Sequence, residues 1–350
     1  MISGGRTGLG RGVSLDGVSL AYCCLLVLLL ASVEWFAEVW LIFAILLFAP
    51  PMFYALPFCI LTPLLAWRKR WWHVLLHLAC IGIVFGVFMT YRLHRARTGG
   101  ESPVTVITHN IGQGDREAFV DYFPGEEPDI VLLQDAGRRR ELFAKRFPTH
   151  RIKTLDQFVL LSPHTILKGD LVQSVSWRGT PVVARFELMI RGREVAVYNV
   201  HMPTPRPSLK RIFSPRVWLE MFGIADASTE GFPSYRAWLD ARMALSVELD
   251  KALGNEKLPY LVGGDFNMPD HGRMYRLFSA RMIDAFAACG NGWGFTFPGT
   301  KDSTAGTILG PWLRIDYLFA GRGWKPVDCR TADDARSQHR AVLGRFEPVK

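Results

Sequence analysis

The stretch from residue 261 to residue 270, LVGGDFNMPD, places a carboxylate and an amide at a spacing that suits phosphate chemistry. Its apolar start stops at two glycines, and Asp265 and Asn267 follow, which predicts a buried strand that ends in a tight loop. Side chains two residues apart on an extended chain point to the same face. Asp265 could therefore polarise water or face a metal ion, and Asn267 could donate to a phosphoryl oxygen. A strand followed by an ordinary Asx turn explains the same residues.

Comparable polar side chains accompany apolar, strand-like runs elsewhere after residue 103. In chain order they are Asn110 after residues 104–108, Asp135 after residues 128–134, His201 after residues 195–200, Asp316 inside residues 313–319, and His339 before residues 341–346. Either histidine alone is explained equally well as a core or surface residue. The complementary chemistry of the whole set favours one shared site over a series of unrelated turns.

This ordered set resembles the endonuclease/exonuclease/phosphatase superfamily, the deoxyribonuclease-I-like metal-dependent phosphoesterases, over roughly residues 104–346. The resemblance implies an α/β fold with two facing β-sheets flanked by helices, a four-layer α/β/β/α sandwich with its site at one rim. Strand-like runs at residues 158–162 and 182–190 and a helical pattern at residues 235–253 agree with a mixed α/β architecture.

The resemblance also implies a role for each residue of the set. Asn110 and Asp135 match the positions that bind the divalent metal, Mg²⁺ or Mn²⁺. The catalytic positions are Asp265 for the attacking water, Asn267 beside it, His201 on the leaving-group side, His339 on the phosphate, and Asp316 as the carboxylate that orients His339. These roles together imply in-line attack of water on a phosphoester, with the metal neutralising charge on the phosphoryl oxygens.

Two positions depart from the family pattern. Asp135 stands where the family normally has Glu, and Gln338 stands where the motif Ser-Asp-His has its Asp. A shorter carboxylate can still bind Mg²⁺ if it lies closer or binds through water. The loss of the second carboxylate lowers the negative charge near the metal, which favours a one-metal enzyme. A non-catalytic binding domain with a degenerate site is an alternative.

The chain has 350 residues and a net charge of +9, which is typical of proteins that meet nucleic acid or an anionic membrane surface. Several cations flank long apolar segments, so the charge indicates less nucleic-acid binding than its size suggests. We expect a disordered tail at residues 1–16, a transmembrane region at 17–91, a flexible linker at 92–103 and the catalytic domain at 104–350. Of the soluble cysteines, Cys289 and Cys329 are expected to be free buried thiols, with a disulfide as the alternative in an exported domain.

About three membrane spans are predicted. They are residues 17–33, residues 39–67 as one kinked span or two half-depth helices, and residues 71–91. The cationic residues 68–70 are expected to be cytoplasmic, which makes this a multi-pass cell-membrane protein with an extracytoplasmic catalytic domain. Arg92, Arg95 and Arg97 argue against that orientation because they follow the third span.

A short linker would hold the catalytic domain near the lipid, and the insertion at residues 203–234 mixes cations with bulky apolar residues, as interfacial segments do. A core helix broken by Pro215 is an equal alternative for that insertion. We therefore expect a membrane-anchored hydrolase of a phosphomonoester, phosphodiester or pyrophosphate, preferably lipid-linked. A membrane-anchored exported nuclease is the main alternative; it should show a basic groove interleaved with aromatic residues, whereas the cations here are scattered. The aromatic residues at 292–298 and Trp312 are expected either to contact substrate or to pack in turns.

Overall fold

The computed structural model describes residues 14–94, 103–112, 127–137, 140–205, 234–299, 308–332 and 337–349, with a few positions between 215 and 224. The chain forms two compact units. Met1–Ser32 with Pro50–Thr90 is the helical unit, and Val33–Ala49 with Tyr91–Lys350 is the α/β unit. The sequence assigned all of residues 17–91 to a membrane region, but the Val33–Ala49 segment belongs to the α/β unit.

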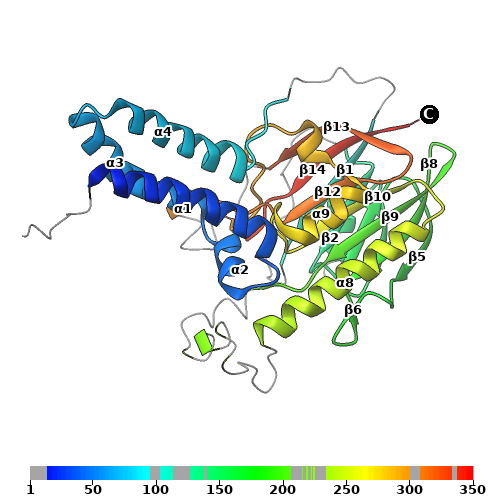
Figure 1. Cartoon of the computed structure of the whole chain (residues 1–350). Coiled ribbons are helices and arrows are strands. Elements are labelled where there is room, and N and C mark those ends of the chain that lie inside the picture. The colour runs from blue at the N-terminus through cyan, green and yellow to red at the C-terminus, as the bar shows by residue number, and fades with distance from the viewer. Residues whose placement is uncertain are drawn as a thin grey trace, which may run out of the picture. The chain divides into compact units, whose positions relative to one another are not determined.

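Two six-stranded sheets form the centre of the α/β unit (Figure 1). The first has the order β13-β14-β1-β2-β4-β3 and the second the order β11-β12-β10-β9-β8-β5. The strands of the first sheet are β1 (Val104–Asn110), β2 (Ile130–Gln134), β3 (Arg151–Leu155), β4 (Phe158–Ser162), β13 (Trp324–Thr331) and β14 (Val342–Pro348). Those of the second are β5 (Thr165–Leu171), β8 (Val183–Ile190), β9 (Arg193–His201), β10 (Tyr260–Asp265), β11 (Ile283–Asp284) and β12 (Asp316–Ala320). The strands β6 (Ser176–Trp177) and β7 (Thr180–Pro181) pair separately.

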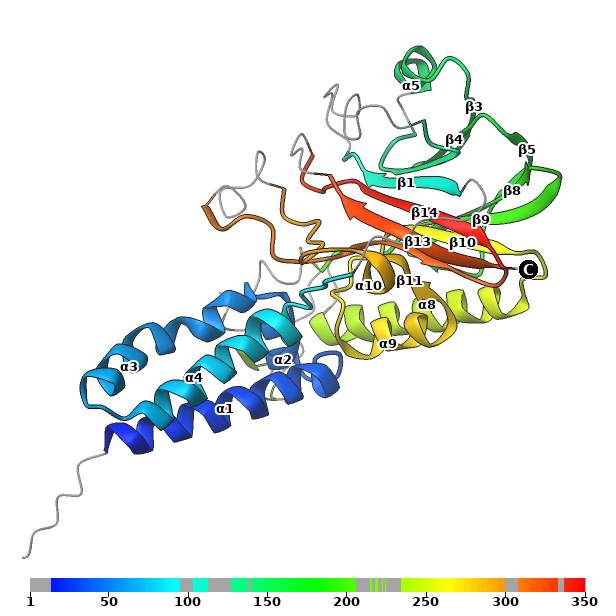
Figure 2. The same cartoon turned by 90° about the horizontal axis from the view of Figure 1, so that it is seen from above.

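Helices cover the outer faces of both sheets, so the unit has four layers (Figure 2). The helices are α5 (Arg140–Arg146), α8 (Tyr235–Asn255), α9 (Gly272–Arg281) and α10 (Ala285–Cys289). One apolar core joins side chains of both sheets, such as Leu132 and Val197. A second joins the β9–β10 face to α8 and α9, and a third joins β1, β2 and β4 to Phe143 of α5. Burial on both faces explains why the central strands are continuously apolar. The predicted four-layer sandwich is confirmed.

The register of the strands brings the predicted site residues together. β1 and β2 run parallel with Asn110 opposite Gln134, so Asp135 follows directly. Asp265 lies opposite His201 in the parallel pair β9–β10 and opposite Asp316 in the antiparallel pair β10–β12. Asp265 is therefore the centre of a row of three polar residues across the second sheet.

The two glycines of the opening motif lie inside β10, not after it. A Cβ atom on Gly264 would lie 2.0 Å from the carbonyl oxygen of Val200, and one on Gly263 would lie 2.8 Å from side chains of Leu132 and Leu318. Gly264 also has a φ of +147°, which L side chains rarely adopt. The expected strand end at these glycines is therefore wrong: they allow close packing while β10 continues to Asp265.

The helical unit contains the first 18 residues of α1 (Leu15–Phe36), followed after residue 49 by the 3₁₀ turn η1 (Pro51–Ala55), α3 (Leu56–Trp67), α4 (Trp71–Gly82) and the π-helical turn η2 (Ile83–Phe88). Ser19 Oγ lies 3.0 Å from His73 Nδ1 and 2.8 Å from His77 Nε2, and Thr62 Oγ1 lies 2.8 Å from His77 Nδ1. The two histidines therefore link α4 to α1 and α3.

Two helices in the described part of the chain are long and apolar enough to cross a membrane, Leu15–Phe36 and Trp71–Phe88. A third span is formed if Ile42–Phe48 and Pro51–Trp67, bent by 103° at a short break, count as one. The alternatives of a kinked span and two half-depth helices both fit this bend. α2 (Leu41–Phe48), however, packs on the α/β unit, because Ala44 lies in the core with α8 and β9.

The start of the predicted flexible linker is docked on the α/β unit. Arg92 and Gly292 exchange backbone hydrogen bonds of 2.8 and 2.9 Å, and the backbone N–H of His94 donates to Asn291 Oδ1 at 2.7 Å. The ring of Tyr91 contacts that of Trp293 edge to face. Residues 92–94 are thus part of the folded unit. Residues 95–102, residues 1–13 of the predicted tail and most of the insertion at 203–234 lie outside the described residues, whereas α1 already begins at Leu15.

Candidate active site

Asp265, the last residue of β10, is the residue on which the hydrogen bonds of the site converge, and it is 1% exposed. Its Oδ2 accepts from Asn110 Nδ2 at 3.0 Å and from Asn267 Nδ2 at 3.1 Å. Its Oδ1 accepts the backbone N–H of Asn267 at 2.8 Å. The Nε2 atoms of His201 and His339 lie 3.7 and 3.8 Å from Oδ2. Three donors therefore fix the carboxylate between two imidazoles.

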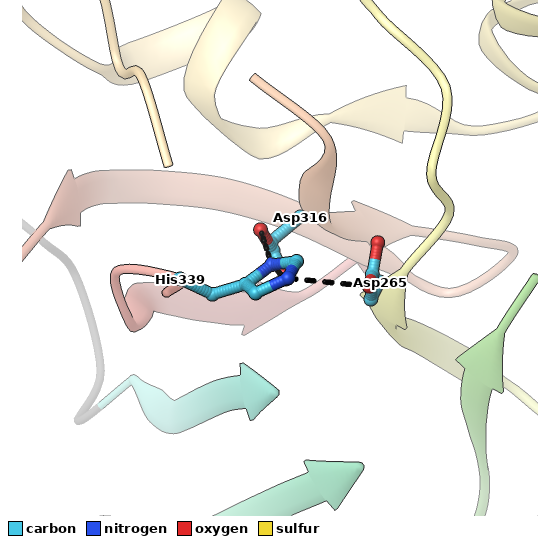
Figure 3. A group of neighbouring side chains, drawn as sticks. All are labelled: Asp265, Asp316 and His339. Atoms are coloured by element: carbon cyan, nitrogen blue, oxygen red, sulfur yellow. Dashed lines mark hydrogen bonds and ion pairs between the residues drawn. The ribbon is translucent and has the colours of Figure 1, made fainter. Parts of the chain in front are cut away.

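Asp316 and His339 form a buried pair beside Asp265 (Figure 3). His339 Nδ1 lies 2.9 Å from Asp316 Oδ2, and Thr296 Oγ1 accepts the backbone N–H of Asp316 at 3.2 Å. Burial raises the pKa of Asp316, and the neighbouring His339 opposes that rise. Donation of the Nδ1 proton to Asp316 fixes the tautomer, which turns Nε2 toward Asp265. This contact has the geometry that the predicted orienting role of Asp316 requires.

Asn110 ends strand β1, and Asp135 directly follows the parallel strand β2. Asn110 Oδ1 accepts the backbone N–H of Gly112 at 3.0 Å and keeps a second lone pair for a ligand. Asp135 has a left-handed φ of 53°, and its side chain is 22% exposed, with Oδ1 3.8 Å from His201 Nδ1. Mg²⁺ prefers one or two such oxygen ligands and keeps several waters, so this pair fits a hard divalent cation.

A second group with metal-binding geometry is Asp265, Asp316 and His339, whose ligand atoms lie within 4.8 Å of one another. The hydrogen bonds of Asp265 and of the Asp316–His339 pair already engage these groups with each other and with the asparagines. The partly exposed carboxylate of Asp135 and the remaining lone pair of Asn110 Oδ1 suit Mg²⁺ better, which favours the Asn110–Asp135 pair as the metal position.

His201 ends β9 and is held by Gln157, which the sequence did not indicate. Its Nδ1 lies 2.6 Å from Gln157 Oε1, and its Nε2 lies 3.4 Å from Asn110 Nδ2. Because an amide oxygen only accepts, Nδ1 carries the proton and Nε2 faces the site as an acceptor. Gln157 lies in the turn between β3 and β4, where no motif distinguishes it from other turn residues.

Asn267 forms hydrogen bonds within the protein, which differs from the expected contact with a phosphoryl oxygen. It has a left-handed φ of 48°, and its amide N–H groups donate to Met202 O at 2.9 Å and to Asp265 Oδ2 at 3.1 Å. Both donors are used within the protein, so Asn267 orients Asp265 in this structure. The sequence had predicted donation to a phosphoryl oxygen.

Further residues, to which the sequence analysis gave no role in holding the site, support it from neighbouring segments. Ser337 Oγ donates to Asn110 O at 2.8 Å, and the ring of Phe297 lies 5.0 Å from that of His339. His109 Nε2 lies 3.2 Å from His339 O, and burial lowers the pKa of His109 to about 3, so it is a neutral structural residue. The contacts of Ser337 and of His109 join positions 227 and 230 residues apart, which no local pattern reveals.

The remaining predictions concern residues near the site. Phe297, in the aromatic loop, reaches His339, whereas Trp312 Nε1 donates to Phe48 O at 3.2 Å and so packs in the fold. Gln338 is exposed. Cys289 and Cys329 are buried free thiols, as expected from the sequence, and do not form the alternative disulfide.

Comparisons with known proteins agree with this geometry. The model of the Endonuclease/Exonuclease/phosphatase family matches residues 107–339. An endonuclease/exonuclease/phosphatase from Bacteroides vulgatus superposes with a TM-score of 0.51 at 15% identity, covering 71% of this chain and 100% of that chain. An AP endonuclease from Archaeoglobus fulgidus superposes with a TM-score of 0.50 at 14% identity, covering 70% of this chain and 99% of that chain. A search of curated proteins gives no match.

The two solved structures share the fold of this chain, and the family match covers the predicted site residues from Asn110 to His339. These residues meet at one rim of the two sheets, as the register and hydrogen bonds show. The chain therefore belongs to the endonuclease/exonuclease/phosphatase family, and it is a hydrolase with the metal-dependent phosphoesterase fold.

Proposed function

We propose that this protein is a membrane-anchored, Mg²⁺- or Mn²⁺-dependent phosphoesterase that hydrolyses a lipid-linked phosphomonoester, phosphodiester or pyrophosphate on the extracytoplasmic side. The observation that carries the proposal is the path of the chain. It passes between the helical unit and the α/β unit three times, after Ser32, after Ala49 and after Thr90. If the helical unit spans the membrane, the α/β unit cannot leave the lipid surface.

The chemistry is assigned to the residues described above. A divalent cation at Asn110 and Asp135 supplies positive charge to the phosphoryl oxygens when it is bound. Asp265, fixed by its donors, orients the attacking water and accepts its proton. His339, held by Asp316 through Nδ1, contacts a phosphoryl oxygen through Nε2 when the ring is protonated at both nitrogens. The Nε2 of His201 faces the same space and, once protonated, serves the leaving oxygen.

Exposed aromatic residues support a lipid partner. Trp35, Phe36 and Trp40, at the start of the Val33–Ala49 segment, are all exposed. Aromatic side chains, Trp above all, are enriched where protein meets the lipid headgroups. Within the insertion, Trp218, Leu219, Phe222 and Ile224 are exposed apolar residues as well. A tethered enzyme meets substrates of its own membrane at effective concentrations of order millimolar, whereas free DNA gains little from tethering.

Contacts within the helical unit support the orientation. Asp16, near the start of α1, lies 3.4 Å from Arg70 and 3.8 Å from His73. The start of α1 and the cationic loop at residues 68–70 therefore lie at the same end of this unit. Cationic loops favour the cytoplasmic side, so the chain after α4 would emerge on the opposite side.

The test uses the full-length protein in lipid vesicles with Mg²⁺, Mn²⁺ or EDTA. Phosphate or headgroup release is measured from a lipid phosphate, a polyprenyl pyrophosphate, a soluble phosphodiester and DNA. We expect metal-dependent turnover that is about tenfold or more faster on a lipid substrate than on DNA, because of the effective concentration. Faster turnover of DNA would establish the nuclease alternative, and no turnover of any substrate would contradict a working enzyme. A reporter fused after Lys350 should be active outside the cytoplasm; activity in the cytoplasm would overturn the orientation.

A further inference from the structure

Arg242 holds the backbone on which two site residues lie. It comes from α8, it is 2% exposed, and its NH2 donates to Phe266 O at 2.9 Å and to Asn267 O at 2.8 Å. These carbonyls directly follow Asp265, and Asn267 has a left-handed backbone. One guanidinium therefore fixes the turn after β10. The same group stacks 4.7 Å over the ring of Trp238.

A buried guanidinium needs an opposite charge, which the two carbonyls do not carry. Arg242 lines a small cavity together with residues of the Val33–Ala49 segment, and Glu38 is the acidic residue among those lining it. Burial raises the pKa of Glu38, and the positive charge of Arg242 opposes that rise. We infer that Glu38, which lies between the first two predicted spans, supplies the opposite charge for Arg242.

Glu38 also binds the other end of the same turn. Its carboxylate accepts the backbone N–H of Met274 at 3.1 Å and that of Arg273. These N–H groups open α9, and His271 at the N-cap position of α9 makes no side-chain capping bond. A carboxylate at a helix N-terminus satisfies free N–H groups and suits the helix dipole. Glu38 therefore replaces a local cap at residues 273 and 274, while Arg242 holds the carbonyls of residues 266 and 267 at the other end of this stretch.

We propose that Glu38 and Arg242 are positioning residues for catalysis, and that the Val33–Ala49 segment is a working part of the active-site scaffold. The inference rests on the proposed catalytic role of Asp265. It predicts that turnover depends on a residue that the sequence places between two membrane helices. Glu38 touches neither substrate nor metal in this arrangement and acts through Arg242 and α9.

The experiment measures kcat, KM and the thermal midpoint of the full-length protein in detergent, with Mg²⁺ and bis(p-nitrophenyl) phosphate as the soluble probe. E38Q keeps the shape but removes the charge, and R242K keeps the charge but cannot bind both carbonyls in the same way. We expect each to lower kcat about 10- to 100-fold with KM within about threefold, because small displacements of a catalytic group cost up to about 10²-fold. Because the two residues act on one turn, the losses of E38Q/R242K should be clearly less than multiplicative.

Glu34 provides the matched control. It lies one helical turn before Glu38 and also binds the start of α9, through His271 Nδ1 at 2.9 Å and through Arg276. It does not line the cavity with Arg242. E34Q should therefore keep kcat within about twofold of the wild type. Equal losses of kcat in E34Q and E38Q that follow their thermal midpoints would show a merely structural role and overturn the proposal.

A second readout does not depend on turnover. Amide hydrogen exchange of residues 273 and 274 should be faster in E38Q than in E34Q, because these two N–H groups donate to Glu38, whereas Glu34 binds His271 and the N–H of Gly272. Unchanged exchange in E38Q would overturn the proposal. The variant D265N distinguishes failure of the positioning role from failure of the proposed function. If D265N is inactive while E38Q and R242K keep the wild-type kcat, the positioning role fails and the proposed function stands. A fully active D265N would remove the proposed function itself.

Discussion

The two halves of the active site are built in different ways. In the half formed by Asp265, Asp316 and His339, the side chains are buried and hydrogen bonded to one another or to neighbouring residues. In the half formed by Asn110 and Asp135, the carboxylate is partly exposed, and its Oδ1 lies 3.8 Å from Nδ1 of His201. The first half is preorganised by the protein alone. The second offers oxygen ligands whose final arrangement depends on the cation.

The two departures from the family pattern both belong to the second of these halves, the one that would bind the metal. Asp135 and Gln338 both concern the metal side, and neither is among the residues that hold Asp265 in place. A change of ligand length or charge there alters metal affinity while the catalytic hydrogen bonds remain. The structure thus favours a one-metal enzyme over a degenerate scaffold, and the following variants test that comparison.

The largest effect is expected in the preorganised half. D265N and H339A should each lower turnover by about 10²- to 10⁴-fold, because they remove a proton acceptor and a phosphate contact. Measurements of kcat at saturating Mg²⁺, with circular dichroism as a folding control, will check this. Turnover near the wild-type rate in either variant would show that the buried half is only structural.

The metal half should respond to the cation as well as to mutation. D135A should lose about 10²- to 10³-fold in turnover, since a bound cation contributes several kcal/mol to charge stabilisation. Part of that loss should be recovered at high Mg²⁺ or Mn²⁺, whereas D265N should gain nothing from added metal. Titration of activity with metal distinguishes the two. A silent D135A would place the metal elsewhere and bring back the binding-domain alternative.

A smaller loss is expected when the orientation of His339 is changed. D316N keeps the size of the side chain but can present an amide N–H to Nδ1, so the imidazole adopts the wrong tautomer. Outer partners of this kind typically contribute about 10- to 100-fold. The kcat of D316N should fall in that range with metal affinity unchanged. A change in metal affinity instead would mean that Asp316 is a ligand, as its proximity to Asp265 and His339 allows.

Restoring the family carboxylate should have a modest effect. Q338D adds a negative charge at an exposed position next to His339, which should tighten Mg²⁺ binding by up to about fivefold, or roughly 1 kcal/mol for a screened charge. Turnover at saturating metal should stay within about threefold. Isothermal titration with Mg²⁺ reports the affinity directly. A large rise in kcat would indicate that a second cation takes part.

The smallest effect is expected from cutting the predicted linker. A protease site inserted between residues 99 and 100 breaks one of three chain connections between the units, while the Val33–Ala49 segment keeps its contacts with α8 and α9. The cleaved protein should stay in the membrane and keep most of its turnover of lipid substrates. Sedimentation of vesicles after cleavage, with an E38Q sample alongside, will check this. Complete release of the α/β unit would restore the single-tether interpretation.

The sequence predicted most of the site because strand ends are locally encoded. Apolar runs end at or just before Asn110, Asp135, His201 and Asp265, so each side chain lies where its strand ends. The pairing of the strands then brings these side chains together. The second turn residue, Asn267, was found but its partner was not, since Met202 lies 65 residues away.

What was missed depends on contacts between distant parts of the chain. No motif surrounds these residues: Gln157 lies in a hairpin turn, Arg242 on a long helix, and Glu38 just after an apolar helix that could cross a membrane. A lone Glu before an apolar run looks like an ordinary loop residue. Only the fold shows that it binds α9, 235 residues further on.

That separation sets the order of events during biosynthesis. Glu38 leaves the ribosome 235 residues before Arg273, its partner at α9. At about 5 to 20 residues per second, the wait is on the order of 10 to 50 s. If the first helix enters the bilayer as it is made, the Val33–Ala49 segment is already at the membrane when the last strands of the sandwich appear. The active site is then completed at the lipid surface, after the first helix has entered the bilayer.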